Sequence, residues 1–164
     1  MSPTSPEKVL HLEQFLPYRL SLLANILSAS LADFYASQYD LNPPEWRVIA
    51  VLAQSPGLTS AGVVARTAMD KVAVSRAVAR LLRQGRLSRL QSNVDRRCTA
   101  LELTRAGLAL YRAVAPRALA YERDLLRALP KADRERLDVI LERLTRRARD
   151  LHDDRIMDAT KDPG

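Results

Sequence analysis

The chain has 164 residues, one cysteine and a net charge of +7 from 26 basic and 19 acidic side chains. This length suits a single domain, 1–164, and a lone cysteine excludes a framework of disulfides within the chain, while five glycines and few aromatic residues favour a mainly α fold. The polar start lacks the layout of a signal peptide and no apolar run approaches the roughly 20 residues of a membrane span, so we expect a cytoplasmic protein without membrane contact.

Residues 16–39 are predicted to form a long helix. Leucines and one phenylalanine recur there at steps of three and four residues, from Leu16 to Phe34, as on one apolar face of an α-helix. Such a stripe lies apart from the compact middle of the chain, so it suits pairing with a second copy better than wrapping a monomer. We therefore assign residues 10–40 to a dimerisation region.

A second helix is predicted to begin at Pro43 and to run through Ala53. Asn42 is a favourable N-cap, proline suits the first helical position, and Glu45 can reach back to close a capping box. Residues 55–57, Ser-Pro-Gly, then break the helix. Its inner face is expected to draw on Trp46, Ile49, Ala50 and Leu52.

Two short helices are predicted next, over residues 60–67 and 71–84, with Thr59 and Asp70 as N-caps and Gly85 as the stop. Two short helices with a tight joint form a helix-turn-helix. The inward face of the second helix is apolar. Its outward face carries Lys71, Val72, Ser75, Arg76, Ala79 and Arg80.

After this motif the apolar residues recur only two or three positions apart. This spacing predicts short strands over residues 86–90 and 99–103 around a polar, basic loop. Such a hairpin is a wing, and residues 41–104 are therefore predicted to form a winged helix-turn-helix core. Long helices over 105–129 and 131–152 complete the fold. We assign residues 105–152 to the dimerisation region and expect residues 153–164 to be disordered.

The charge excess is concentrated between Arg66 and Arg97, where nine basic residues face two acidic ones. Concentrated positive charge predicts a polyanionic partner, here double-stranded DNA. A merely solvated charged face is the other interpretation, and it fits the C-terminal helix, where acids alternate with arginines. Lys71, Ser75 and Arg76 are placed to reach base edges in the major groove. Contacts with phosphates are expected from Arg80, Arg83, Arg86 and Arg89.

Residues 95–107 resemble the wing signature of the MarR family of transcriptional regulators, D-x-R-x-x-x-L-x-L-T-x-x-G. The resemblance continues upstream through Leu41-x-x-x-Glu45-Trp46, residues 69–76 and Leu81-x-x-x-Gly85. It implies a homodimer whose end helices intertwine, and a regulator, most often a repressor, of a palindromic operator. It also implies that Arg97 enters the minor groove and that Asp95 steadies it. The full predicted DNA-binding set is Thr59, Ser60, Lys71, Val72, Ser75, Arg76, Arg80, Asp95, Arg96 and Arg97. Gly62 and Arg86 depart from the residues usual in the family.

The same resemblance implies an effector. Members of this family commonly release DNA when a small aromatic or phenolic acid binds between the dimer helices and the winged helix, through differential affinity for one conformation. The candidate ligand-binding residues are Asn25, Ser28, Trp46 and Arg47. A core aromatic is the alternative interpretation of Trp46, and a surface ion pair is that of Arg47.

Other functions are weighed against this one. Cys98, beside two arginines, could make the chain a redox-sensing regulator, although a lone cysteine is more often a small packing residue. His11 and His152 are far apart and no phosphate-binding glycine loop is present in the sequence, so we expect no catalytic residues, metal or cofactor. A protein-binding regulator that uses the winged helix as a scaffold is the remaining alternative, and the arginine density argues against it.

Overall fold

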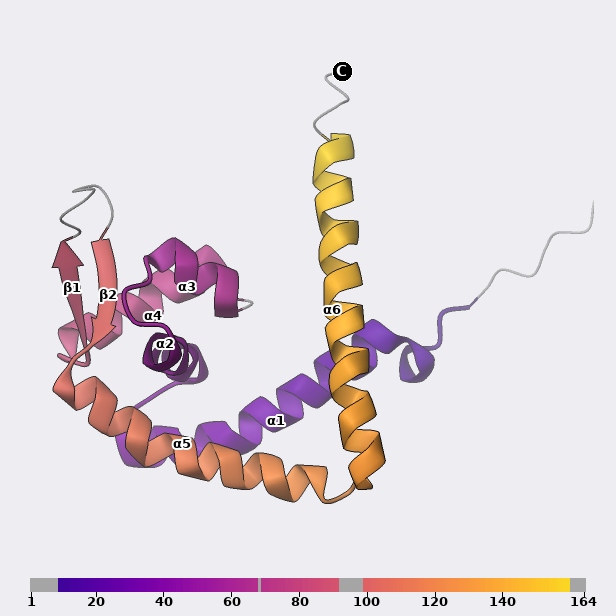
Figure 1. Ribbon diagram of the computed structural model, residues 1–164, viewed down its shortest axis with the longest axis horizontal. Helices are drawn as coiled ribbons and strands as arrows, with labels where there is room; N and C mark the ends of the chain where they lie inside the picture. The colour runs from indigo at the N-terminus through magenta and orange to yellow at the C-terminus, as the bar shows by residue number, and fades with distance from the viewer. Residues whose placement is uncertain (1–8, 68, 92–98, 160–164) are drawn as a thin grey trace, which may run out of the picture. The chain divides into compact units, whose positions relative to one another are not determined.

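The computed structural model describes residues 9–67, 69–91 and 99–159, and it divides the chain into two compact units, Met1–Ala118 and Leu119–Gly164. Length alone predicted a single domain, and the second unit was not predicted. Figure 1 labels the α-helices and the strands. In chain order the elements are η1 (Leu12–Gln14), α1 (Leu16–Tyr39), α2 (Pro43–Gln54), α3 (Ser60–Thr67), α4 (Lys71–Arg83), β1 (Leu87–Gln91), β2 (Thr99–Leu103), α5 (Arg105–Leu126) and α6 (Lys131–Ala159).

Helix α1 has the predicted bounds and ends at Asp40, which adopts the left-handed conformation with φ 46°. By length and composition α1 could cross a membrane, so the expectation that no apolar run approaches that length is wrong. One such helix is weak evidence for a span. The C-terminal half of α1 packs Leu31, Phe34 and Tyr35 against the winged-helix core, which is a role in a folded domain.

The caps of the winged helix are those that the sequence predicts. In the capping box of α2, the Glu45 N–H donates to Asn42 Oδ1 and the Asn42 N–H donates to Glu45 Oε2, both at 3.0 Å. Thr59 Oγ1 accepts the Gly62 N–H at 3.2 Å, and Asp70 Oδ1 accepts the Ala73 N–H at 2.7 Å. Each cap satisfies a backbone donor that has no partner within its helix.

Strands β1 and β2 pair antiparallel, with Leu87 opposite Leu103 and Arg89 opposite Leu101. The hairpin stands beside the bundle of α2, α3 and α4 (Figure 1). A further bridge joins Leu58, just before α3, to Leu101: the Leu101 N–H donates to Leu58 O at 2.9 Å, and the Gly57 N–H donates to Leu101 O at 3.1 Å. The wing is thus attached by hydrogen bonds to the helix-turn-helix.

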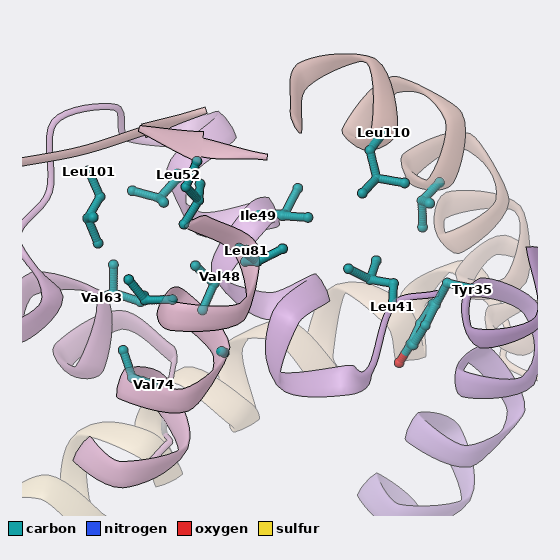
Figure 2. Packing of buried hydrophobic residues seen from close by; sticks show 14 residues of the cluster. Tyr35, Leu41, Val48, Ile49, Leu52, Val63, Val74, Leu81, Leu101 and Leu110 are labelled. Atoms are coloured by element: carbon teal, nitrogen blue, oxygen red, sulfur yellow. The ribbon is translucent and has the colours of Figure 1, made fainter. Parts of the chain in front are cut away.

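The core of the first unit lies between the helices and the hairpin. Figure 2 shows side chains of α2, α3, α4 and β2 gathered together, with a second group formed by α1, α5 and the segment that joins α1 to α2. Trp46 and Ala50, predicted on the inner face of α2, are only partly buried. The completely covered side chains include Leu41, Val48, Ile49, Leu52, Val63, Val74, Leu81, Leu101 and Val114.

Thr104 and Gly107 fix the start of α5 against the turn after α4. The Thr104 hydroxyl donates to Gly85 O at 2.7 Å and accepts the Gly107 N–H at 3.2 Å, and the Thr104 N–H donates to Arg86 O at 3.1 Å. A Cβ on Gly107 would collide with the same Arg86 carbonyl oxygen. A threonine followed three residues later by glycine is therefore a packing requirement of this joint.

The C-terminal helices differ from their predicted bounds. Helix α5 ends at Leu126 instead of residue 129, and α6 continues to Ala159 instead of residue 152. The disorder expected from residue 153 onward is therefore wrong for residues 153–159, while residues 160–164 lie outside the described residues. The assignment of residues 10–40 and 105–152 to dimerisation stays a prediction.

Candidate nucleic-acid interface

The outward face of α4 carries most of the predicted DNA-binding residues. Lys71, Val72, Ser75, Arg76 and Ala79 are exposed. The opposite face is buried in the core, so packing decides which side of α4 faces outward. Within the first two turns, the outward face combines a cation, an aliphatic group, a hydroxyl and a guanidinium. Groups of these kinds can contact base edges and phosphates.

A groove of about 340 Å³ runs between α3 and α4. Ser60 lies on one wall, and Lys71 and Ser75 lie on the other. The structure therefore brings these three predicted residues together. Thr59, by contrast, uses its hydroxyl oxygen to cap α3, and this is the role that its contacts show.

Arg80 is engaged within the protein. Its Nη2 lies 2.6 Å from Asp40 Oδ1 and its Nη1 lies 3.0 Å from Glu45 Oε1. The hydrogen bond with Asp40, together with the charge of Glu45, raises the pKa of the Arg80 guanidinium above its ordinary value. Two of the guanidinium nitrogens are thus engaged by carboxylates of the protein itself, and the contact of Arg80 with DNA stays a prediction.

Arg86 and Arg66 are also engaged. Arg86 donates to the carbonyl oxygens of Tyr39, at 2.6 Å, and Asp40, at 3.2 Å, and so caps the last turn of α1. The phosphate contact of Arg86 likewise stays a prediction. Arg66 bonds the Ser55 hydroxyl. Sequence reasoning missed these pairings because the partners of Arg80 and Arg86 lie 35 to 47 residues away in the chain.

Arg76 and Arg83 line a second groove, of about 370 Å³, between the start of α2 and α4. Both are exposed, as is Arg89 on β1. Because the side chains of these three arginines are exposed, their predicted contacts with phosphates or bases stay predictions. The predicted wing residues, Asp95, Arg96 and Arg97, and the redox candidate Cys98 lie outside the described residues.

The candidate effector residues fall into two places. Trp46 is half-buried and stacks between Tyr35 and Tyr111, with ring centroids 6.4 and 6.0 Å away. Burial raises the pKa of Tyr35 above its ordinary value. Sequence reasoning missed both tyrosines, because aromatic residues far apart in the chain give no signal of stacking.

The polar candidates lie on the exposed side of α1 and α2. Arg47 Nη2 donates to the Ser28 hydroxyl at 3.4 Å, so the structure brings these two together. Asn25 is exposed on α1. In the part of the chain that the structure describes, no group of three or more His, Cys, Asp and Glu side chains could hold a metal ion.

Comparisons with known proteins agree with this architecture. The sequence profile of the MarR family matches residues 39–97. The fold is similar to a MarR/EmrR family transcriptional regulator from Acinetobacter sp. ADP1, with a TM-score of 0.80 and 25% identity over 86% of this chain and 99% of that chain. No curated protein matches the chain.

Two further structures are similar in fold. The PcaV transcriptional regulator from Streptomyces coelicolor, solved with its natural ligand, has a TM-score of 0.70 and 22% identity over 87% of this chain and 99% of that chain. Streptococcus pneumoniae FabT, solved with DNA, has a TM-score of 0.66 and 23% identity over 82% of this chain and 95% of that chain. The predicted mainly α winged helix-turn-helix is confirmed.

Proposed function

We propose that this chain, whose residues 39–97 match the sequence profile of the MarR family, is a transcriptional regulator that binds double-stranded DNA. The observation that carries the proposal is the outward face of α4, where Lys71, Ser75 and Arg76 are exposed on a helix held by its core face. A helix of this kind fits the major groove, where an arginine can bond guanine in a bidentate way. The structure of FabT with DNA supports the proposal at the level of the fold.

The proposed DNA-binding form is a homodimer on a palindromic operator. Large apolar side chains stand exposed along α1, including Leu23 and Ile26, and, in the second unit, along α6, including Ile140 and Leu144. Large apolar side chains left exposed along a helix mark an interface. Two copies related by a two-fold axis would present two α4 helices to half-sites about one turn of DNA apart.

We propose further that the chain represses transcription in the cytoplasm and releases DNA when an aromatic or phenolic acid binds. The pair formed by Ser28 and Arg47 offers a hydroxyl and a cation for a carboxylate, and the half-buried Trp46, which precedes Arg47 in the chain, is the aromatic candidate beside them in sequence. The complex of PcaV with its natural ligand supports an effector for a protein of this fold. No cofactor is needed for such a response.

Selection of bound fragments from genomic DNA of the source organism tests the proposal, and it is repeated with a panel of aromatic acids. The wild-type chain should recover a palindrome, and one acid should abolish its recovery. Arg76→Ala should cost about 1–3 kcal/mol and relax the preference at one base position of each half-site. Recovery of DNA without a common sequence would overturn the specific regulator, and an equal loss on every sequence would overturn the base-reading role of Arg76.

A further inference from the structure

Arg80 lies on α4 one turn after Arg76, yet its surroundings differ from those of its neighbours. Both of its terminal nitrogens are bound to carboxylates, at 2.6 Å from Asp40 and 3.0 Å from Glu45. Its side chain is 34% exposed, and a guanidinium fork of this kind is more rigid than a single-point contact. We refer to Asp40, Glu45 and Arg80 as the carboxylate clamp.

Glu45 could not lose this partner without cost. It is 1% exposed, its Oε2 accepts the Asn42 N–H in the capping box, and its Oε1 accepts from Arg80. A buried carboxylate is tolerated only where hydrogen bonds and an opposite charge compensate it. If Arg80 turned to a DNA phosphate, Glu45 would be left buried without its cation.

Asp40 connects the clamp to the end of α1. Its Oδ1 binds Arg80, its Oδ2 accepts from Gln84 Nε2 at 3.2 Å, and its main-chain carbonyl accepts from Arg86. Three side chains from the end of α4 and the following turn thus hold Asp40, the C-cap residue that directly follows α1. Helix α4 packs chiefly on α2 and α3, and these polar contacts join α4 and the turn after it to the end of α1.

We propose that Arg80 is a positioning residue, which through Glu45 and Asp40 fixes the recognition helix α4 relative to α2 and the end of α1 without touching DNA. The inference rests on the proposed DNA-binding function. With 3.6 residues per turn, Arg80 follows Arg76 on nearly the same side of α4, so holding Arg80 sets the direction in which Arg76 leaves the helix. The clamp acts on sequence-specific affinity through geometry, whereas a phosphate contact acts through charge.

The test compares Arg80→Met with Arg83→Met, a matched loss of one arginine from the same helix. Affinity of the full-length dimer is measured at several salt concentrations for the fragment that the wild-type chain selects and for a scrambled fragment of equal composition. Arg80→Met should weaken binding to the selected fragment by about tenfold. The slope of log K against log salt should not change for this variant, whereas Arg83→Met should flatten it by ~0.9.

A double variant, Glu45→Gln with Arg80→Met, separates positioning from stability. Glutamine removes the buried charge and can still accept the Asn42 N–H, so the thermal midpoint lowered by Arg80→Met should largely recover. Affinity for the selected fragment should stay about tenfold below wild type, while affinity for the scrambled fragment is nearly unchanged.

Three results would overturn part of this account. A slope flattened by Arg80→Met as much as by Arg83→Met would make Arg80 a phosphate contact. Full recovery of specific affinity in the double variant would make the clamp a stabilising ion pair and nothing more. If the wild-type chain itself binds both fragments equally, the proposed function fails and the positioning role fails with it, a result visible without any variant.

Discussion

Val72 is 58% exposed on the outward face of α4, between charged and polar neighbours. A β-branched aliphatic group gains nothing from water, and in a major groove it would meet the methyl group of a thymine. Its position one residue into α4 is within the first turn, from which side chains of a recognition helix reach base edges.

We therefore expect one thymine of each half-site to be read through its methyl group by Val72. Replacing that thymine with uracil removes only the methyl and should weaken wild-type binding by about fourfold per contact, the equivalent of about 0.8 kcal/mol for one buried carbon. Val72→Ala should bind the thymine and uracil duplexes equally, as measured by fluorescence anisotropy. Uracil placed outside the half-sites is the control. Persistence of the thymine preference in Val72→Ala would exclude this contact.

At the residue scale, sequence reasoning identified exposed positions but not the partners of charged groups. Helical periodicity correctly set Lys71, Ser75 and Arg76 on the outward face of α4. Periodicity also set Arg80 on this face. A pattern of period 3.6 gives the side of the helix on which a residue lies, but it does not reveal Asp40 and Glu45, which the tertiary fold brings next to Arg80. The stacking of Trp46 on two tyrosines was hidden for the same reason.

Replacement of glycine by alanine is expected to have opposite effects on stability at two helical positions, Gly107 and Gly62. In α5, an added Cβ on Gly107 would meet the Arg86 carbonyl oxygen, which belongs to the backbone and cannot yield cheaply. In α3, an added Cβ on Gly62 would lie 3.2 Å from Leu58 Cδ2, the end of a flexible side chain. Helix propensity favours alanine at both positions, and sterics oppose it strongly at only one.

Gly107→Ala should therefore destabilise the protein by about 1–3 kcal/mol, because overpacking outweighs the gain in propensity. Gly62→Ala should be neutral or stabilise by up to about 1 kcal/mol. Urea unfolding followed by circular dichroism, at one fixed protein concentration, measures both. Equal stabilisation by the two substitutions would contradict the close approach of α5 to the turn after α4.

At the element scale, capping chemistry predicted the starts of helices better than their ends. Asn42, Thr59 and Asp70 each cap the helix that the sequence assigned to them. The ends of α5 and α6 were misplaced by three and seven residues. Polar composition was interpreted as disorder beyond residue 152, yet a helix satisfies its backbone hydrogen bonds internally and can therefore continue through a polar segment.

At the scale of the whole molecule, the exposed isoleucines of the end helices allow a test of dimerisation. Ile26 on α1 and Ile140 on α6 are 53% and 52% exposed in a single chain, and the proposed dimer would cover them. Ile26→Asp or Ile140→Asp would place a carboxylate in that apolar interface at a cost of several kcal/mol, so the dissociation constant of the dimer should rise about a hundredfold or more.

Sedimentation velocity over a range of protein concentrations measures this shift. Ala79→Asp is the control, since it adds the same carboxylate to the exposed face of α4, which is not part of the proposed interface, and should leave the mass at twice that of one chain. A wild-type chain that sediments as a monomer at all concentrations would contradict the dimer. The apolar stripes of the end helices, which lie apart from the middle of the chain in sequence, led to the expectation of pairing. The division into two units depends on contacts that no local pattern contains.

The bridge between Leu58 and Leu101 has a consequence for local unfolding. Hairpins in isolation open and close readily, and their amide hydrogens exchange with solvent at each opening. Here the amide of Leu101, a residue 1% exposed, is held by Leu58, and its carbonyl holds Gly57. An opening that frees the root of the wing must also release the segment that begins α3, so the wing root and the helix-turn-helix belong to one cooperative unit of hydrogen exchange.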